Sequence, residues 1–163
     1  MLKDQIKEDM IAALKSGDSA KRSLLGMVMA SIKNKELEKR GKLIKTITDS
    51  VQLEAESQLT EQETLDVVAS EVKRRRDSVT EFEKGGRPEL AESERAEAEA
   101  LMAYLPTQMS DDELRVLVQK FVASTGATDA KDMGKVMSAL KLELKGTADG
   151  QRVSTMVKEE LAK

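Results

Sequence analysis

Residues 60–84 read TEQETLDVVASEVKRRRDSVTEFEK, and this stretch sets the expectation for the fold. Thr60 and Glu63 form a capping box, in which the side chain of each residue accepts a hydrogen bond from the backbone amide of the other. Apolar side chains then recur every three or four residues, the period of one helix face. They are Leu65, Val68, Val72, Val79 and Phe82. We therefore predict an amphipathic helix that runs to about Lys84.

The spacing of these apolar residues places Arg75 on the buried face of the helix. A guanidinium that leaves water must be paired with an acidic group, and Glu71, four residues earlier, is the first candidate. Such a pair would clamp the packing of neighbouring helices. The functional alternative is an arginine face, to which Arg74 and Arg76 belong, that contacts phosphates or the carboxylates of a partner.

Similar periodicity predicts helices on the N-terminal side of this stretch. The apolar residues of the first recur at four-residue steps: Leu2, Ile6, Met10 and Leu14. This helix is expected to end at Gly17, because glycine readily takes the left-handed conformation that closes a helix. A second helix is predicted over residues 19–40, with Gly41 as its end. Residues 41–59 are a connector, in which a short helix is one alternative.

On the C-terminal side, KGGRP (84–88) ends the central helix. A helix rich in alanine and glutamate is predicted from Pro88 to Tyr104. LPTQM (105–109) is the expected domain boundary, because Pro106 interrupts helical pairing.

A second capping box, Ser110 with Glu113, follows this boundary at once. Three short helices with apolar faces are predicted between it and the end of the sequence. The sequence therefore predicts an all-α protein. It comprises an N-terminal helical domain of about four helices, residues 1–106, and a small three-helix tail domain, residues 107–163.

The composition excludes several kinds of catalytic site. The chain has no Cys and no His, so disulfides, cysteine nucleophiles and a Ser-His-Asp triad are impossible. We expect no catalytic residue, no metal and no cofactor. The longest apolar run, LLGMVMASI (24–32), is too short to cross a bilayer, and the first residues carry no targeting signal. We expect a cytoplasmic protein without a membrane partner, whose net charge of −3 leaves only local basic patches for nucleic acid.

Glycine and lysine are concentrated in KDMGKVMSALKLELKGTADGQRV (131–153). A Walker A loop is not expected, because Gly150 is followed by Gln-Arg and no strand precedes Gly146. Gly146 is instead predicted to end one helix, while Asp149 and Gly150 turn into the next and Asp149 caps it. The start of that next helix could also offer backbone amides to a phosphate.

Gly134 is unusual because it lies within a helical pattern, where glycine costs about 1 kcal/mol relative to alanine. Close packing of another helix is the favoured explanation, and approach of a ligand backbone is the alternative. The candidate phosphate contacts nearby are Lys131, Lys135, Lys145 and Arg152. Their alternative is a solvated face, with ion pairs to the interleaved acidic residues such as Asp132.

Three motifs together resemble the YqeY-like proteins over nearly the whole chain. They are EVKRRRDSVTEF (71–82), YLPTQMSDDEL (104–114), and KDMGKVM with LKGTADGQRV (131–153). Members of this family share a tail domain with the GatB subunit of the glutamine-dependent aspartyl/glutamyl-tRNA amidotransferase. In that enzyme the tail helps to hold the tRNA and contributes no catalytic residue. Similar domains appear beside some glutaminyl-tRNA synthetases.

The resemblance implies a non-catalytic accessory protein that binds tRNA, with an amidotransferase or an aminoacyl-tRNA synthetase as its protein partner. The implied tRNA contacts are the basic residues Lys131, Lys135, Lys145 and Arg152, with Arg74 and Arg76. The implied backbone-shaping residues are Gly134, Gly146, Asp149 and Gly150. Ser138 departs from the family pattern, in which a second glycine is frequent there. The alternatives are a protein-interaction module without nucleic-acid contact, and amido transfer from glutamine together with partner subunits.

Overall fold

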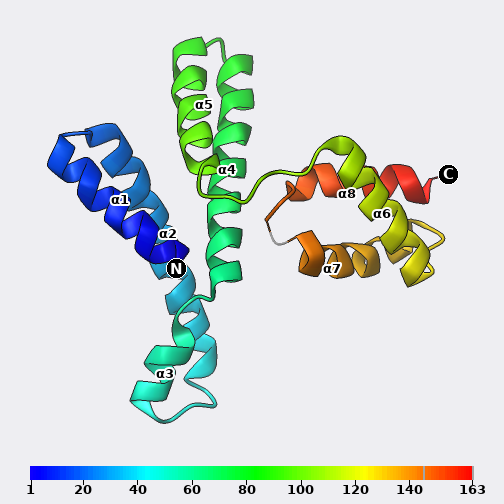
Figure 1. Cartoon of the computed structure of the whole chain (residues 1–163), viewed down its shortest axis with the longest axis horizontal. Coiled ribbons are helices and arrows are strands. Elements are labelled where there is room, and N and C mark those ends of the chain that lie inside the picture. The colour runs from blue at the N-terminus through cyan, green and yellow to red at the C-terminus, as the bar shows by residue number, and fades with distance from the viewer. Residues whose placement is uncertain (145, 163) are drawn as a thin grey trace. The chain divides into compact units, whose positions relative to one another are not determined.

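The computed structural model describes residues 1–144 and 146–162, and all regular secondary structure in these ranges is helical (Figure 1). This confirms the predicted all-α class. The chain divides into two compact units, Met1–Tyr104 and Leu105–Lys163, and each is considered by itself. Among the described residues, no helix has both the length and the apolar character needed to span a membrane.

The first unit consists of two helical hairpins and a short helix that follows the first of them (Figure 1). Its helices are α1 (Leu2–Ser16), α2 (Ser19–Leu43), α3 (Ser50–Ser57), α4 (Glu61–Lys84) and α5 (Pro88–Met102). α1 packs on α2, α5 packs on α4, and α3 packs on α2. The connector expected over residues 41–59 therefore contains a helix, which was one of its two alternatives.

The expected end of the second helix at Gly41 is wrong, because α2 continues to Leu43. Gly41 does not adopt the left-handed conformation that would close a helix there. Beyond it, α3 packs against α2, and Arg40 pairs with Glu54 of α3. These tertiary contacts extend the helix past a residue of low helix propensity.

The expected burial of Leu14 in α1 is also wrong. Its exposed fraction is 59%, whereas Ala13 is 3% exposed and takes the position in the core. Four residues turn an α-helix by about 40° more than one full turn. A row at four-residue steps that starts in the core at Leu2 and Ile6 therefore leaves the core by its fourth member.

Arg75 is buried in the first unit and paired, as the helix periodicity predicts. Its Nη1 lies 2.8 Å from Glu71 Oε2, and its Nε lies 2.9 Å from Glu97 Oε2 on α5. Ser31 of α2 donates a hydrogen bond of 2.8 Å to the other carboxylate oxygen of Glu71. The buried charges thus join three helices, and no buried side-chain nitrogen or oxygen among the described residues lacks a partner.

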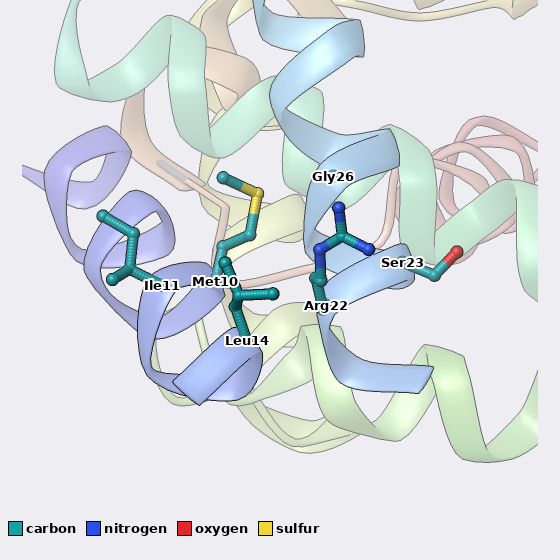
Figure 2. A pocket seen from close by; sticks show the side chains of 6 residues that line it. All are labelled: Met10, Ile11, Leu14, Arg22, Ser23 and Gly26. Atoms are coloured by element: carbon teal, nitrogen blue, oxygen red, sulfur yellow. The ribbon is translucent and has the colours of Figure 1, made fainter. Parts of the chain in front are cut away.

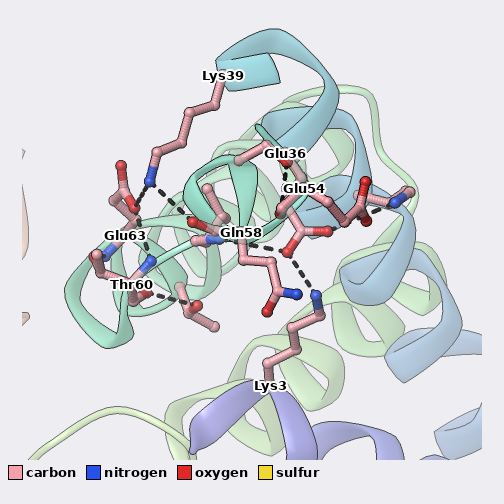
Figure 3. Close-up of polar contacts among 11 residues, drawn as sticks. Lys3, Glu36, Lys39, Glu54, Gln58, Thr60 and Glu63 are labelled. Carbon is pink, nitrogen blue, oxygen red and sulfur yellow. Dashed lines mark hydrogen bonds and ion pairs between the residues drawn. The ribbon is translucent and has the colours of Figure 1, made fainter. Parts of the chain in front are cut away.

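A second polar cluster joins α1, α2 and the start of α4 (Figure 3). Glu36 of α2, 6% exposed, accepts hydrogen bonds from Lys3 Nζ and from the backbone amide of Leu59. Lys39 Nζ donates to Glu63 Oε2 at 2.8 Å, and this bond is the largest influence that holds the pKa of Glu63 below its ordinary value. Thr60 and Glu63 form the predicted capping box of α4.

The last residue of the first unit is tied back to its first helix. Tyr104 Oη donates a hydrogen bond of 2.6 Å to Asp9 Oδ2 of α1. Partial burial, together with the neighbouring Asp9 carboxylate, raises the pKa of the Tyr104 hydroxyl above its ordinary value. The chain therefore leaves this unit from a fixed point.

The second unit is a small bundle of three α-helices and a 3₁₀ turn. Its elements are α6 (Asp111–Thr125), η1 (Ala130–Asp132), α7 (Met133–Leu144) and α8 (Gly150–Leu161). Its core is wholly apolar: Leu114, Val118, Val136, Leu140, Leu144, Val153 and Val157. The capping box predicted for Ser110 and Glu113 is present at the start of α6.

Candidate nucleic-acid interface

The turn between α7 and α8 contains Gly146 and Asp149 of the GTADG motif (146–150). Gly146 adopts a φ of 86°, a left-handed conformation that favours glycine. Asp149 caps α8, because its carboxylate accepts hydrogen bonds from the backbone amides of Gln151 (2.8 Å) and Arg152 (3.2 Å). These amides are satisfied within the chain, and the Asp149 charge would repel an anion there. The start of α8 is therefore a poor site for phosphate.

The segment before α6 is seated on this turn. The Met109 amide donates to the Thr147 carbonyl at 2.7 Å, and Gln108 Nε2 donates to the Gly146 carbonyl at 2.9 Å. The segment LPTQM (105–109) thus belongs to the second unit and packs on its GTADG turn. No side-chain pattern in the sequence indicates these contacts, because three of the four groups involved in them belong to the backbone.

Arg152 completes this seat from α8. Its Nη2 donates to the Met109 carbonyl at 3.1 Å and pairs with the Asp111 carboxylate in the first turn of α6. Its side chain is 37% exposed. The guanidinium is therefore engaged in holding the start of α6 against α8, and its position suits internal support better than contact with an external phosphate.

Lys131 and Lys135, by contrast, are exposed and lie four residues apart on η1 and α7. Neither ammonium group makes a hydrogen bond or ion pair with a residue that the structure describes. The solvated-face alternative expects ion pairs here, but Asp132 instead accepts a hydrogen bond of 3.1 Å from the Thr128 amide. Both lysines are available to a ligand. Lys145, the third predicted lysine, lies outside the described residues.

Gly134 lies on the surface between these two lysines. A Cβ atom built there would meet nothing within 4 Å, so the favoured explanation, close packing of another helix, is wrong. One turn later, Ser138 is also exposed and turns its hydroxyl onto the Gly134 carbonyl at 2.8 Å. The two small residues leave the backbone of α7 open on this side. The alternative explanation, approach of a ligand backbone, stays a prediction.

Most acidic residues of the second unit lie at helix starts, whereas Glu143, Glu159 and Glu160 lie near the ends of α7 and α8. Asp129 accepts a hydrogen bond from the Lys131 amide at 2.7 Å, and Asp149 caps α8. Glu113 accepts hydrogen bonds from the amide and hydroxyl of Ser110, and the amide bond is the largest influence that lowers the Glu113 pKa. The positive ends of the helix dipoles partly compensate these charges. The protein is acidic overall, with a net charge of −3, but Lys131 and Lys135 lie on the surface of the second unit without an acidic partner among the described residues.

Arg74 and Arg76, the other predicted phosphate contacts, lie on α4 in the first unit, whereas Lys131 and Lys135 belong to the second unit. Arg74 of α4 is 73% exposed, and its Nη1 lies 3.3 Å from Glu71 Oε1. Arg76 donates to the sulfur of Met102 at 3.0 Å. Gly150, the last predicted backbone-shaping residue, is the exposed first residue of α8. Within the described ranges, no group of three or more acidic side chains could hold a metal ion.

Comparisons with known proteins give the family context of these features. The family model described as Yqey-like protein matches residues 3–161. Among curated proteins, Altered inheritance of mitochondria protein 41, mitochondrial, from Eremothecium gossypii is 29% identical over 100 residues. That match covers 61% of this chain and 46% of the relative, so the chain spans less than half the length of that protein.

Proposed function

The chain belongs to the Yqey-like protein family, and we propose that it is a non-catalytic accessory protein that binds tRNA through the exposed side of η1 and α7. The observation that carries this proposal is the open backbone at Gly134 between Lys131 and Lys135. Further support comes from the resemblance of the tail motifs to the GatB tail.

The chemistry of this surface suits the sugar-phosphate backbone of a folded RNA. Lysine ammonium groups are mobile point charges that contact phosphates without reading bases. Gly134 and Ser138 keep the surface low, so that a bulky backbone can approach the helix. With only two Phe, one Tyr and no Trp in the chain, stacking on splayed bases contributes little. Recognition is therefore of RNA shape and charge.

The remaining candidate residues take different roles in this proposal. Lys145, which follows α7 in sequence, remains a proposed phosphate contact. Arg152 supports the surface indirectly, since it fixes α8 against the start of α6. Arg74 and Arg76 provide a second contact region in the first unit.

The protein partner of the proposal is an enzyme that acts on the same tRNA, either an amidotransferase or an aminoacyl-tRNA synthetase, in the cytoplasm. This part rests on the resemblance to GatB and to the domains beside glutaminyl-tRNA synthetases. The purified full chain is expected to show no glutaminase or ATPase turnover alone. Turnover by the pure protein would replace the accessory role with an enzymatic one.

Binding of the purified, nuclease-treated full chain to total tRNA, measured at several salt concentrations, tests the proposal. We expect micromolar affinity and a linear fall of its logarithm with the logarithm of salt concentration. Lys131→Gln with Lys135→Gln should weaken binding and reduce the magnitude of the salt slope by about two. Lys120→Gln, on α6, is the matched control and should leave both quantities nearly unchanged.

Gly134→Leu separates the open backbone from charge in the same assay. Added helix propensity should preserve or raise the stability of α7, while the new side chain covers the approach to the backbone. We therefore expect weaker tRNA binding by a protein that unfolds no earlier than the parent. Equal affinity of the parent, the double lysine variant and Gly134→Leu would refute the proposed surface.

A further inference from the structure

The first unit carries a surface hollow between α1 and α2 that its own core does not fill (Figure 2). Its volume is about 390 Å³. It is lined by Met10, Ile11 and Leu14 of α1 and by Arg22, Ser23 and Gly26 of α2. Met10 and Leu14 project from α1 into the space beside α2 (Figure 2).

The lining is apolar and exposed. Ile11 is 40% exposed and Leu14 is 59% exposed, although both are large apolar side chains. On α2, a Cβ atom at Gly26 would meet nothing within 4 Å, so glycine here is not required by packing within the chain. Glycine in a helix interior nevertheless reduces stability. An unfilled apolar groove with a glycine floor indicates that something else occupies it.

The charges around this groove are basic and lack partners. Arg22 is the one charged residue of the lining, and its guanidinium makes no hydrogen bond or ion pair with any residue described. The same holds for the ammonium groups of Lys7, Lys15 and Lys21. Lys7 lies one turn before Met10 and Ile11, and so on the same side of α1.

The acidic residues near the groove do not neutralise it. The Asp18 carboxylate accepts a hydrogen bond from the Lys21 amide and caps α2. Asp9 is hydrogen-bonded to Tyr104. Glu8 lies about 60° around α1 from Ile11 and about 160° from Met10, so it borders the groove on one side only and is outnumbered by the basic side chains. By contrast, many basic side chains elsewhere in this unit are in ion pairs, among them Lys35, Lys39, Arg40 and Arg95.

We propose that the α1–α2 groove binds an acidic amphipathic helix of a partner protein. Leucine-like side chains spaced three and four residues apart would enter the groove over Gly26, beside Leu14 and Met10. Aspartate or glutamate side chains flanking them would pair with Arg22 and Lys7. The apolar lining favours a protein over a nucleic-acid backbone, because a sugar-phosphate chain has no apolar side chains to place beside Met10, Ile11 and Leu14.

A phage-displayed library of single helices tests this proposal. The surface positions of each helix are randomised over apolar, acidic and basic residues, and the full chain is the bait. Selection should enrich helices with an apolar stripe flanked by acidic residues. Gly26→Leu fills the groove and should weaken the selected helix roughly tenfold or more, without lowering the melting temperature. Arg22→Glu should weaken binding of the selected helix and strengthen binding of a helix in which lysine replaces its flanking glutamate. Lys45→Glu, an exposed lysine outside the lining, is the matched control.

Other outcomes would overturn the proposal. Selected helices without acidic residues, or with affinities that Gly26→Leu leaves unchanged, would show that the groove is not their site. A dimer in light scattering that Gly26→Leu dissociates would assign the groove to a second copy of the chain. Binding to vesicles of anionic phospholipid that the same substitution abolishes would assign it to a membrane surface.

Discussion

The two units of this chain differ in the kinds of side chain that each of them buries. All the buried polar and charged residues identified among the described residues lie in the first unit: Glu36, Ser57, Thr64, Glu71 and Arg75. In the second unit, the buried side chains that the structure describes are all apolar, and capping contacts close the starts of α6 and α8. The first unit thus adds buried ion pairs to its apolar core, whereas the core of the second unit contains no charge among the described residues. The first unit should thus be sensitive to single charges and the second to volume.

The largest expected effect is at Arg75. Arg75→Ala leaves the Glu71 carboxylate buried without its main partner and should lower the unfolding free energy of the first unit by about 3–5 kcal/mol. Arg74→Ala, at a side chain that is 73% exposed, is the control and should change it by less than about 0.5 kcal/mol. Urea denaturation with amide hydrogen exchange in each unit measures both.

A double replacement sharpens this test. Glu71→Leu with Arg75→Met removes both charges and should recover much of the loss, because an apolar pair needs no compensation. An Arg75→Ala variant as stable as Arg74→Ala would mean that the buried pair does not hold the first unit.

A smaller loss is expected in the second unit. Leu140 is fully buried in the apolar core, and Leu140→Ala should cost about 3 kcal/mol through lost transfer energy and the cavity left behind. Leu142→Ala is the control two residues away, since Leu142 is 78% exposed. Exchange protection should fall in residues 105–162 and stay unchanged in the first unit. Loss of protection in both units would show that they unfold as one.

The smallest effect concerns the two capping-box glutamates. The pKa of Glu63 and that of Glu113 are both held below the ordinary value, so each stabilises the fold at neutral pH. That stability is lost as the pH falls from the ordinary glutamate pKa through the lowered one. Melting temperature against pH should therefore fall less steeply in this acid range in Glu63→Gln and in Glu113→Gln.

Salt distinguishes the two glutamates. The Glu63 shift arises first from Lys39, an ion pair that high salt screens, whereas the Glu113 shift arises from hydrogen bonds to Ser110. High salt should shrink the effect of Glu63→Gln and leave that of Glu113→Gln nearly intact. Equal sensitivity to salt would contradict this assignment of causes.

Local chemistry made much of the fold predictable. Both capping boxes depend on residues three apart, and the burial of Arg75 follows from the period of its own helix. Leu14 was misplaced because four-residue steps drift off the core face of its own helix, and Gly41 because the end of α2 depends on how α3 packs against it. The contacts of Gln108 and Met109 with Gly146 and Thr147 span 38 residues, and three of their four groups are backbone groups, so side-chain patterns do not predict them.

The candidate site was predictable only as a set of basic residues. The sequence does not distinguish Lys131 and Lys135, which are available, from Arg152, which is engaged with Met109 and Asp111. It marks Gly134 as unusual, but whether a glycine faces a neighbour or solvent depends on tertiary structure. The groove between α1 and α2 was missed because Leu14 was assigned to the core.

The bonds from Arg152 to Met109 and Asp111 bear on how the protein is made on the ribosome. The capping box of Ser110 and Glu113 can close the first turn of α6 at once, but its anchor on Arg152 comes 41 residues later and must wait until α8 has left the exit tunnel. The longest contact described within the first unit joins Tyr104 to Asp9, so this unit can fold once residues 1–104 have left the tunnel, while synthesis of the tail continues. A nascent chain would thus present its finished N-terminal hairpins, and the groove between α1 and α2, before its tail domain exists.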